Sequence, residues 1–390
     1  MLRFLTAGES HGPSLIALLE GMPAGVPINR AAIDEQLHRR QGGYGRGGRM
    51  KIEHDQVDFL SGVRHGHTLG SPIALRIENR DWANWQDRMG ADPVSQPPEA
   101  VTRVRPGHAD LTGALKYGFD DVREAIERSS SRETAARVAA GAVCRQLLDA
   151  FGIVIHSHVL AVGGVGYSES ERPDSGAVDL AFWDRVDASE MRCADPDLTA
   201  RMIARILEGK RDGDTCGGIF EVVATSAPIG LGSYSEWDRR LSGRIAQSLL
   251  SIPSAKGVEI GAGFASASLP GSQVHDVVRH DDQRGWYHRT NNAGGIEGGI
   301  SNGEPIVARV AVKPIPTLAH PLPSVDVRTG ENIDETRYER SDVCVVPAAG
   351  VVGEAMLAFT LADAFLEKFG GDSLSEIRRN YDGYLASLNR

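Results

Sequence analysis

One short stretch near the N-terminus carries side chains suited to binding a small polyanion. Residues 39–51 read RRQGGYGRGGRMK, with five basic side chains, five glycines and no acid, in a chain of formal net charge -10. Guanidinium groups match carboxylate and phosphate oxygens in pairs, and glycine lets the backbone approach a ligand closely. The stretch predicts a cationic loop that closes on a small anion, although a solvated surface loop and an RNA-binding tether are alternative interpretations.

Two histidines occur in turn sequences, where an imidazole is accessible to a ligand. His11 follows Ser10 in GESHG, and His108 lies in RVRPGHAD between Arg105 and Asp110. A histidine close to a carboxylate can act as an acid or a base near neutral pH. A structural role would require only a hydrogen bond that fixes the turn. The functional interpretation is favoured because the basic loop and other glycine and arginine clusters occur in the same chain.

A third cluster, RSSSRET, precedes the clearest helical pattern in the chain, which ends near residue 152. Its polar members at the expected helix N-terminus are Arg128, Ser129, Ser130 and Arg132. Ser130 and Glu133 have the spacing of a capping box. Free N–H groups and the helix dipole favour an anion at such an end. The cluster therefore predicts a phosphate site, since a simple cap would account for only one serine and the glutamate.

Periodicity places these clusters in an α+β protein. The 390 residues are 41% hydrophobic and 24% charged, which is ordinary for a globular chain. Strands are expected within residues 1–20, 49–79, 153–166, 219–225, 258–264 and 304–312, and helices at 29–40, 130–152, 195–210, 235–250, 350–369 and 373–388. Residues 167–200 are acidic and irregular, which predicts a surface insertion.

An internal similarity indicates duplicated halves. Residues 66–77 and 299–310 share the pattern G-x-[ST]-x-G-x-P-I-x-x-R-[IV]. Such a repeat predicts two similar turn-strand units, in halves of about 1–152 and 215–350 that pack as a single domain, 1–390. No G-x-G-x-x-G motif links a strand to a helix, so a Rossmann nucleotide site has no support.

Charge and composition limit the class of protein further. A sequence pI near 5.7 argues against general nucleic-acid binding. We expect no run of the roughly 18 apolar residues that span a bilayer and no export signal in MLRFLTAG, which predicts a cytoplasmic protein without a membrane partner. The four cysteines, Cys144, Cys193, Cys216 and Cys344, lack metal-site or disulfide spacing. We therefore expect reduced thiols and no metal.

Together the motifs resemble those of chorismate synthase. GESHG, RRQGGYGRGGR, RPGHAD, RSSSRETAARVAAGA, NNAGGIEGGISNG, KPIPT and RSD occur in the order seen in that family, across residues 5–369. The resemblance implies the anti-1,4-elimination of phosphate from 5-enolpyruvylshikimate 3-phosphate to give chorismate, a step of the shikimate pathway of aromatic amino acid biosynthesis. It implies reduced FMN as cofactor without net redox change, and NADPH only as an indirect reductant through an external flavin reductase.

The resemblance also implies a fold and an assembly. The subunit is expected to be a β-α-β sandwich with pseudo-two-fold duplicated halves, and four subunits form a homotetramer. We expect apolar side chains of the C-terminal helices to be buried between subunits, among them Val351, Val352, Met356, Leu357, Phe359 and Leu361.

By resemblance, roles can be carried to individual residues. Substrate is expected to contact Ser10, Arg40, Arg46, Arg49, Arg105 and Arg132, of which Arg40 and Arg46 match positions also associated with NADPH. Reduced FMN is expected to contact Arg128, Ser129, Ser130, Pro253, Ser254, Gly298, Lys313, Pro314, Ile315, Pro316, Thr317 and Arg340. Much of the family has Asn-Ala at positions 253–254. His11 and His108 are the expected acids, for the leaving phosphate and the flavin ring, and Asp342 is expected to help flavin N5 accept the ring proton.

Two other functional classes remain compatible with these motifs. A flavin- or nucleotide-binding regulatory protein could use the same cationic loop without chemistry of its own. An FMN-dependent NAD(P)H oxidoreductase would oxidise nicotinamide without the shikimate phosphate. The first alternative does not explain why histidine and aspartate motifs accompany the anion motifs, and turnover assays separate all three classes.

Overall fold

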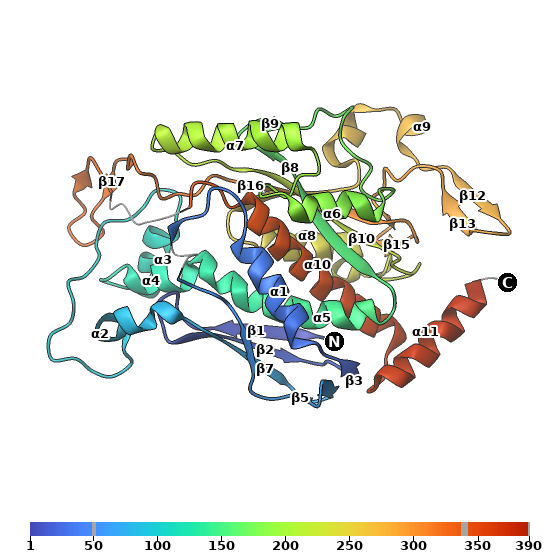
Figure 1. Cartoon of the computed structure of the whole chain (residues 1–390), viewed down its shortest axis with the longest axis horizontal. Coiled ribbons are helices and arrows are strands. Elements are labelled where there is room, and N and C mark those ends of the chain that lie inside the picture. The colour runs from blue at the N-terminus through green and yellow to red at the C-terminus, as the bar shows by residue number, and fades with distance from the viewer. Residues whose placement is uncertain (49–51, 337–341, 389–390) are drawn as a thin grey trace.

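The computed structural model describes residues 1–48, 52–336 and 342–388 as a mixed α and β protein (Figure 1). Two mainly antiparallel sheets lie on opposite sides of a layer of long helices, which includes α1 (Arg30–Gln41), α5 (Thr134–Asp149) and α10 (Val346–Phe369). α5 contacts the first sheet, α10 contacts the second, and the two helices pack against each other. The predicted α+β class agrees with this arrangement.

The first sheet has the strand order β1-β2-β7-β4. Its strands are β1 (Arg3–Ala7), β2 (Ser14–Glu20), β7 (Ile73–Glu78) and β4 (Val57–Phe59), and every neighbouring pair is antiparallel. β2 buries every second side chain, Leu15, Ala17 and Leu19, which is the period of a strand with one face in the core. A smaller sheet has the order β3-β6-β5, with strands β3 (Ala24–Pro27), β6 (His67–Leu69) and β5 (Val63–Arg64). In the chain these three strands lie between β2 and β7.

The second sheet has the order β11-β16-β10-β8-β9. Its strands are β11 (Ala255–Ile260), β16 (Ile306–Val312), β10 (Gly218–Thr225), β8 (Val154–Val162) and β9 (Val165–Gly166). The central strand, β10, pairs antiparallel with both β8 and β16. Phe220 on β10 is fully buried beneath α10, where a Cβ on Gly353 would lie 2.5 Å from its ring.

The two long core helices cross at close range because small residues meet there. A Cβ added to Gly141 of α5 would lie 2.5 Å from the Cβ of Ala355 on α10, so only glycine fits at this crossing. α10 is 24 residues long, with a mean hydropathy of 1.5 over its apolar 18-residue window. By length and composition it could cross a membrane, but 89% of that window is buried inside the protein. α10 is therefore the apolar centre of this fold.

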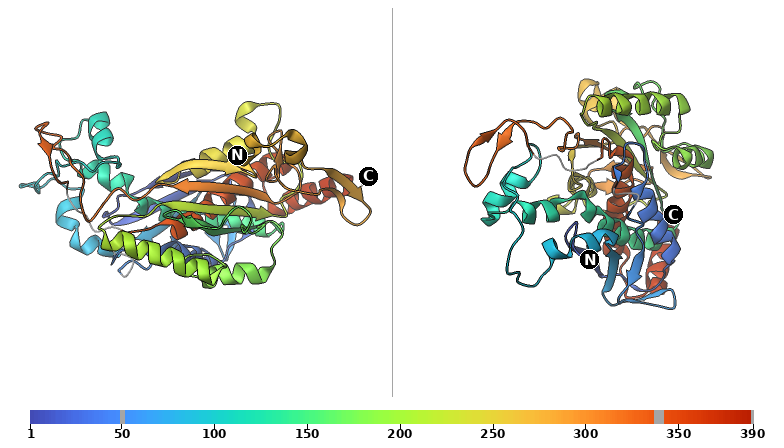
Figure 2. Two further views of the ribbon diagram at one scale, coloured as in Figure 1. Left: turned by 90° about the horizontal axis from the view of Figure 1, so that it is seen from above. Right: turned by 60° about the vertical axis from the view of Figure 1, so that its left-hand side comes forward.

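The remaining described elements cover the sheets or extend from the ends of the molecule. The helices are α2 (Gln86–Met89), α3 (Asp110–Tyr117), α4 (Arg123–Ser129), α6 (Leu180–Ala188), α7 (Pro196–Arg211), α8 (Leu241–Leu250), α9 (Gly271–Val274) and α11 (Leu374–Leu388). The short strand pairs are β12 (Val278–Asp281) with β13 (Gly285–His288), β14 (Ile296–Glu297) with β15 (Ile300–Ser301), and β17 (Ser324–Val325) with β18 (Asn332–Ile333). Figure 2 shows α3 and β17 at one end of an elongated molecule and the β12–β13 hairpin at the other.

Several sequence-based predictions are wrong in detail. Residues 167–200 are not irregular, because α6 lies there and buries Phe182 and Trp183. The helix expected from residue 235 begins at Leu241, after extended backbone at Arg240. The strand expected at 258–264 ends at Ile260, where glycines with positive φ follow at 261 and 263.

The C-terminal apolar residues are likewise placed differently from the prediction. Val351, Val352, Met356, Leu357 and Leu361 are each at most 5% exposed within a single chain. They form part of the core between the two sheets, so the expectation that they are buried between subunits is wrong. Phe359 is half-buried and stacks edge-on against Phe4 of β1, with ring centres 4.8 Å apart.

The repeated sequence pattern coincides with similar local structure in both places. Residues 66–77 form β6 and most of β7, and residues 299–310 form β15 and most of β16. β7 and β16 are both inner strands of the two large sheets. Duplicated halves stay a prediction that this correspondence supports.

Candidate active site

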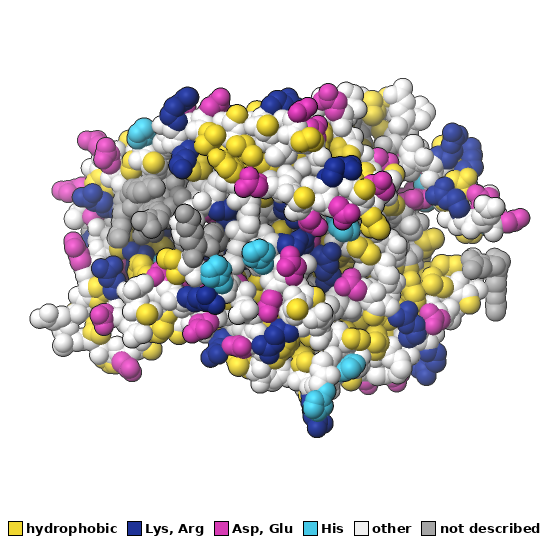
Figure 3. Space-filling model, in the orientation of Figure 1, with side chains coloured by type: hydrophobic (Ala, Val, Ile, Leu, Met, Phe, Trp, Pro, Cys, Tyr) yellow, Lys and Arg dark blue, Asp and Glu magenta, His cyan; other side chains and the backbone are white. Residues whose placement is uncertain are grey.

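A cavity of about 700 Å³ opens between the first sheet, the core helices and the loops that end the second sheet. This volume is in the usual range of ligand pockets. Six basic and two acidic described side chains line it: Arg40, Arg46, Arg105, Arg123, Arg132, Lys313, Asp81 and Asp342. Outside the cavity, acidic and basic side chains are interspersed over the face shown in Figure 3. The cavity is therefore a local positive site on an acidic protein.

His11 lies at the cavity wall and is held by a buried carboxylate. Its Nδ1 is 2.9 Å from Oε1 of Glu127, and its backbone N–H donates to Oε2 of the same residue at 2.8 Å. The ring stacks on Trp85 with centroids 3.9 Å apart. Burial raises the pKa of Glu127, but hydrogen bonds and charge from His11, together with Arg123, outweigh it and hold the pKa below its usual value.

His108 is held in a similar way by Asp110 at the start of α3. Its Nδ1 lies 2.5 Å from Oδ1 of Asp110, whose side chain is fully buried. Arg105 donates to the same carboxylate through Nε and Nη2, at 2.8 and 3.0 Å, and to the Thr317 hydroxyl at 3.1 Å. Burial raises the pKa of Asp110, but hydrogen bonds from His108 and Arg105 and the charge of Arg105 lower it well below its ordinary range.

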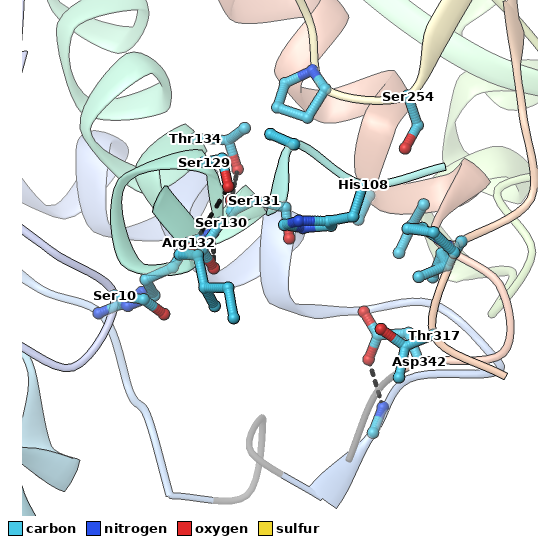
Figure 4. A pocket seen from close by; sticks show the side chains of 18 of the residues that line it. Ser10, His108, Ser129, Ser130, Ser131, Arg132, Thr134, Ser254, Thr317 and Asp342 are labelled. Carbon is cyan, nitrogen blue, oxygen red and sulfur yellow. Dashed lines mark hydrogen bonds between the residues drawn. The ribbon is translucent and has the colours of Figure 1, made fainter. Parts of the chain in front are cut away.

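Asp342 faces the cationic loop from the segment that precedes α10. Its Oδ2 lies 2.8 Å from Nη1 of Arg46, and its Oδ1 accepts from the backbone N–H of Gly47 at 2.5 Å. In Figure 4, Asp342 lies beside Thr317, with Ser10 and Arg132 across the cavity. The loop predicted to bind anions is therefore attached to the segment that carries the third predicted catalytic residue.

Arg40 and Arg132 form a buried cationic pair in the cavity wall. Both donate to Oδ2 of Asp55, at 2.7 and 2.6 Å, and Arg132 also donates to Asn79 at 3.0 Å. Burial, with the charges of Arg132 and Arg46, lowers the pKa of Arg40 to about 10 despite the attraction of Asp55. Within the described parts of the chain, Nε of Arg40 and Nη2 of Arg132 are buried without a hydrogen-bond partner.

Hydroxyl groups and a lysine complete the polar lining. Ser129, Ser130 and Ser131 line the cavity together with Ser254 and Thr317. Of the predicted capping box only the Ser130 half forms, because its hydroxyl accepts from the Arg132 N–H at 3.3 Å while the Glu133 side chain binds Thr6 and Arg137. Arg128 and Ser129 belong instead to the last turn of α4, a helix that the sequence pattern did not predict. The serines therefore lie at a junction between two helices.

The rest of the lining is apolar and suits a planar ring system. It comprises Ile52, Ile126, Ile252, Pro253, Ile315, Pro316, Val345, Ala348, Ala349 and Val352. Lys313 lies at its edge, where Nζ donates to the Gly107 carbonyl at 2.5 Å. Burial and the charge of Lys256 lower the pKa of Lys313. A cavity lined by apolar side chains together with cations and hydroxyls fits a flavin phosphate beside an anionic substrate.

The structure brings together most of the predicted site residues. Those that line this cavity are Ser10, His11, Arg40, Arg46, Arg105, His108, Ser129, Ser130, Arg132, Pro253, Ser254, Lys313, Ile315, Pro316, Thr317 and Asp342. Arg49 and Arg340 lie outside the described residues. Their predicted contacts, and the roles of all the others, stay predictions.

Three predicted cofactor residues do not line the cavity. Arg128 points away from it and donates to the Thr6 carbonyl at 2.9 Å, because the last turn of α4 directs its side chain toward β1. Pro314 is absent from the lining although its neighbours Lys313 and Ile315 take part in it. Gly298 lies in a second, smaller hollow with Asp276 and Asn292. Within a single chain, these three residues are therefore not placed to contact a ligand in the main cavity.

Sequence reasoning missed the residues that hold the predicted ones in place. Glu127, Asp55 and Trp85 contact His11, Arg40 or Arg132 from distant parts of the chain. The i, i+4 spacing of Arg123 and Glu127 was a usable signal for a helix there. Nothing in the sequence alone indicated which cluster that helix would contact.

Fold and site together define an enzyme-like α+β protein with a cationic cavity and two carboxylate-bound histidines. The family model described as chorismate synthase matches residues 2–366. The chorismate synthase of Geobacter metallireducens is 56% identical over 396 residues, covering 100% of this chain and 99% of the relative, and that of Desulforudis audaxviator is 54% identical over 389 residues, covering 100% and 98%. A crystal structure of chorismate synthase matches with a TM-score of 0.81 and 44% identity, covering 100% of this chain and 98% of that one. The chain belongs to the chorismate synthase family.

Proposed function

We propose that this chain catalyses the anti-1,4-elimination of phosphate from 5-enolpyruvylshikimate 3-phosphate to form chorismate, using reduced FMN without net redox change. The observation that carries the proposal is one cavity in which two histidines, each bound to a buried carboxylate, face a set of arginines. Membership of the chorismate synthase family supports the same reaction. The step belongs to the shikimate pathway of aromatic amino acid biosynthesis and makes the enzyme a carbon–oxygen lyase.

Substrate binding follows from the charges in the cavity. The substrate carries one phosphate and two carboxylates, and four arginines of the described lining can hold them: Arg40, Arg46, Arg105 and Arg132. Guanidinium groups fixed by buried carboxylates need little reorganisation when an anion binds, which favours electrostatic preorganisation. Arg40 and Arg46 are assigned to substrate in this proposal, with NADPH acting only on flavin through an external reductase.

Flavin binding is assigned to the apolar wall and the hydroxyl groups beside it. Ser129, Ser130, Ser254, Lys313 and Thr317 surround the space in which the phosphate and polar ring edge would lie. When bound, reduced FMN supplies an electron-rich ring that assists cleavage of the allylic C–O bond and is recovered afterwards. Arg128, Pro314 and Gly298 would contact FMN only if they approached the cavity from elsewhere in the assembly or after a rearrangement.

Proton transfer is assigned to His11, His108 and Asp342. Each histidine binds a carboxylate through Nδ1, so that Nε2 is the ring nitrogen that can hold or donate a proton on the cavity side. Imidazole is the side chain most often used for general acid–base catalysis. Asp342 assists removal of the ring proton, for which Arg46 and the Gly47 N–H hold its carboxylate in place.

The assembly and the location of the enzyme form part of the same proposal. Large apolar side chains that one chain leaves exposed, including Trp237 at 86% and Phe264 at 82%, support association of subunits, and the homotetramer is the assembly that the family resemblance implies. The duplicated halves and the β-α-β sandwich are supported by the matching positions of β7 and β16. A cytoplasmic location is the last part of this proposal, and the external flavin reductase would act there.

The deciding experiment is anaerobic mixing of the protein with reduced FMN and 5-enolpyruvylshikimate 3-phosphate while chorismate absorbance is followed. Chorismate and one equivalent of phosphate are expected without net oxidation of the flavin. Steady nicotinamide oxidation in the absence of substrate would indicate an oxidoreductase instead. Ligand binding without turnover would indicate a regulatory flavoprotein.

A further inference from the structure

Glu127 contacts His11 at two points, although 116 residues separate them in sequence. Its Oε2 accepts from the backbone N–H of His11 at 2.8 Å, and its Oε1 and Oε2 lie 2.9 and 3.0 Å from Nδ1 of the ring. The backbone carbonyl of Glu127 also accepts from the N–H of Ser10 at 3.1 Å. The turn that carries His11 is therefore fastened to α4 through both its backbone and its imidazole.

The remaining freedom of the ring is restricted by an aromatic neighbour. Trp85 stacks on His11 at an interplanar angle of 25°. Arg123 lies 3.3 Å from Oε1 of Glu127 and has its guanidinium 5.4 Å from the centre of the Trp85 ring. The Glu127 side chain is fully buried, whereas the His11 side chain is 18% exposed. Glu127 therefore lies behind His11 as seen from the cavity.

We propose that Glu127 is a positioning residue: by accepting a hydrogen bond from Nδ1–H of His11, it fixes the imidazole tautomer and presents Nε2 to the ligand cavity. A carboxylate on one ring nitrogen decides which nitrogen is available for chemistry. The catalytic consequence rests on the proposed function, whereas the tautomer does not. Asp110 also lies on Nδ1 of His108, but there Nη2 of Arg105 is within 3.1 Å of the same ring nitrogen, so the tautomer argument is made for His11 alone.

Glu127→Gln separates positioning from a purely structural role. The amide keeps the shape of the side chain and an oxygen for the backbone N–H of His11, so the turn should stay attached. It no longer requires a proton on Nδ1, because it can offer the ring either an oxygen or an NH₂ group. Glu124→Gln on the same helix is the matched control, since it removes the same charge from an exposed position.

The tautomer is measured by ¹⁵N spectra of histidine-labelled full-length protein without ligands, with His11→Ala used to assign the His11 signals. At a pH where the ring is neutral, the wild type and Glu124→Gln should show Nδ1–H. Glu127→Gln should show a measurable share of Nε2–H. An unchanged Nδ1–H signature in Glu127→Gln would overturn the proposal, whatever the activity.

Turnover then tests the consequence at saturating substrate and reduced FMN. Glu127→Gln should lower kcat by between roughly 10- and 10⁴-fold, the range seen when a carboxylate that orients a histidine is lost, with KM and FMN affinity within a few-fold of wild type. A changed tautomer with unchanged kcat would also overturn the positioning role. If the wild type itself forms no chorismate, the proposed function fails, while the spectra still decide what Glu127 does.

Discussion

Arg40 and Arg132, which are 92 positions apart, are joined by one carboxylate oxygen, Oδ2 of Asp55. All three side chains are at most 4% exposed. A second buried carboxylate, Glu53, lies 3.8 Å from Nη2 of Arg132, so two carboxylates hold the two guanidinium groups in the cavity wall. An incoming anion therefore meets guanidinium groups that are already fixed in position, which favours binding with little reorganisation.

Asp55→Asn tests this arrangement through stability. Removing one member of a buried ion pair leaves uncompensated charge, so the free energy of unfolding should fall by about 3–5 kcal/mol. Asp58→Asn is the control, because Asp58 is half exposed where it pairs with Arg76 and surface pairs contribute only about 0–1 kcal/mol. Urea unfolding of both variants measures the difference. Equal losses would show that Asp55 has no special function in balancing these arginines.

Glu354→Gln tests a second buried carboxylate, away from the cavity. Glu354 accepts from Arg39, Arg145 and Arg192, with N···O distances of 2.7–3.0 Å. Its burial raises its pKa, but these arginines lower the pKa well below the ordinary value. The variant should lose about 3–5 kcal/mol of unfolding free energy at neutral pH.

The pH dependence of this loss has a definite sign. A carboxylate whose pKa is depressed in the folded state contributes its full stability above the unfolded pKa, about 4.3 for glutamate. That contribution disappears as pH falls through the folded pKa. Unfolding curves of wild type and Glu354→Gln should therefore differ most above about pH 5 and converge in stronger acid. A constant difference across this range would contradict the assignment, and exposed Glu35→Gln on α1 is the control.

The sequence predicted the elements that carry the site better than the contacts within it. Helix α1, with Asn29 as its cap, was expected because Ile33 and Leu37 follow helical spacing and the asparagine precedes them. Helix α4 was missed because its seven residues are too short for a clear period. With it, the partner of His11 was missed.

Long-range pairing explains what the sequence could not supply. Asp55 binds arginines 15 and 77 positions away, and Asp342 binds Arg46 at a separation of almost three hundred residues. A single sequence contains no signal for such contacts, because they depend on how the two sheets and the helices between them pack. The motifs could therefore be named as anion-binding, but not assigned to particular carboxylate partners.

His11→Ala and His108→Ala test the two expected acids. Each should lower kcat by roughly 10²- to 10⁴-fold, the usual range for loss of a general acid, because each ring lines the cavity and is held by its own carboxylate. Circular dichroism checks that the fold is retained, and exposed His38→Ala is the control. Near-wild-type turnover in either variant would remove that histidine from the mechanism.

Flavin and substrate should bind cooperatively. Both are expected in one cavity of about 700 Å³, where each ligand covers the other and neutralises part of the same cationic lining. If binding of one ligand orders the cavity for the other, the affinity of the second ligand rises by the same factor in either order of binding. FMN titrations with and without 5-enolpyruvylshikimate 3-phosphate measure this factor. Equal FMN affinity in both titrations would show that the two sites are independent.

Asp342→Asn distinguishes a base from an anchor of the cationic loop. The amide oxygen can still accept from the Gly47 N–H, but the charge that pairs with Arg46 is lost. If Asp342 assists proton removal, FMN and substrate should bind within a few-fold of wild type. Chorismate formation should slow by at least about 10²-fold, with a larger deuterium isotope effect at the ring position.

The opposite pattern would identify Asp342 as an anchor. Weaker FMN and substrate binding, with kcat at saturation close to wild type, would mean that its carboxylate serves to hold Arg46 and the loop. Arg46→Lys supplies the matched comparison, because it keeps the positive charge but loses the planar guanidinium that meets Asp342. Rapid mixing of the reduced-flavin complex with substrate separates the two cases. If Asp342 is the base, Asp342→Asn should show a large rate defect and Arg46→Lys a smaller one. If Asp342 is an anchor, both variants should lose affinity together, because each breaks the same contact between the loop and the segment that precedes α10.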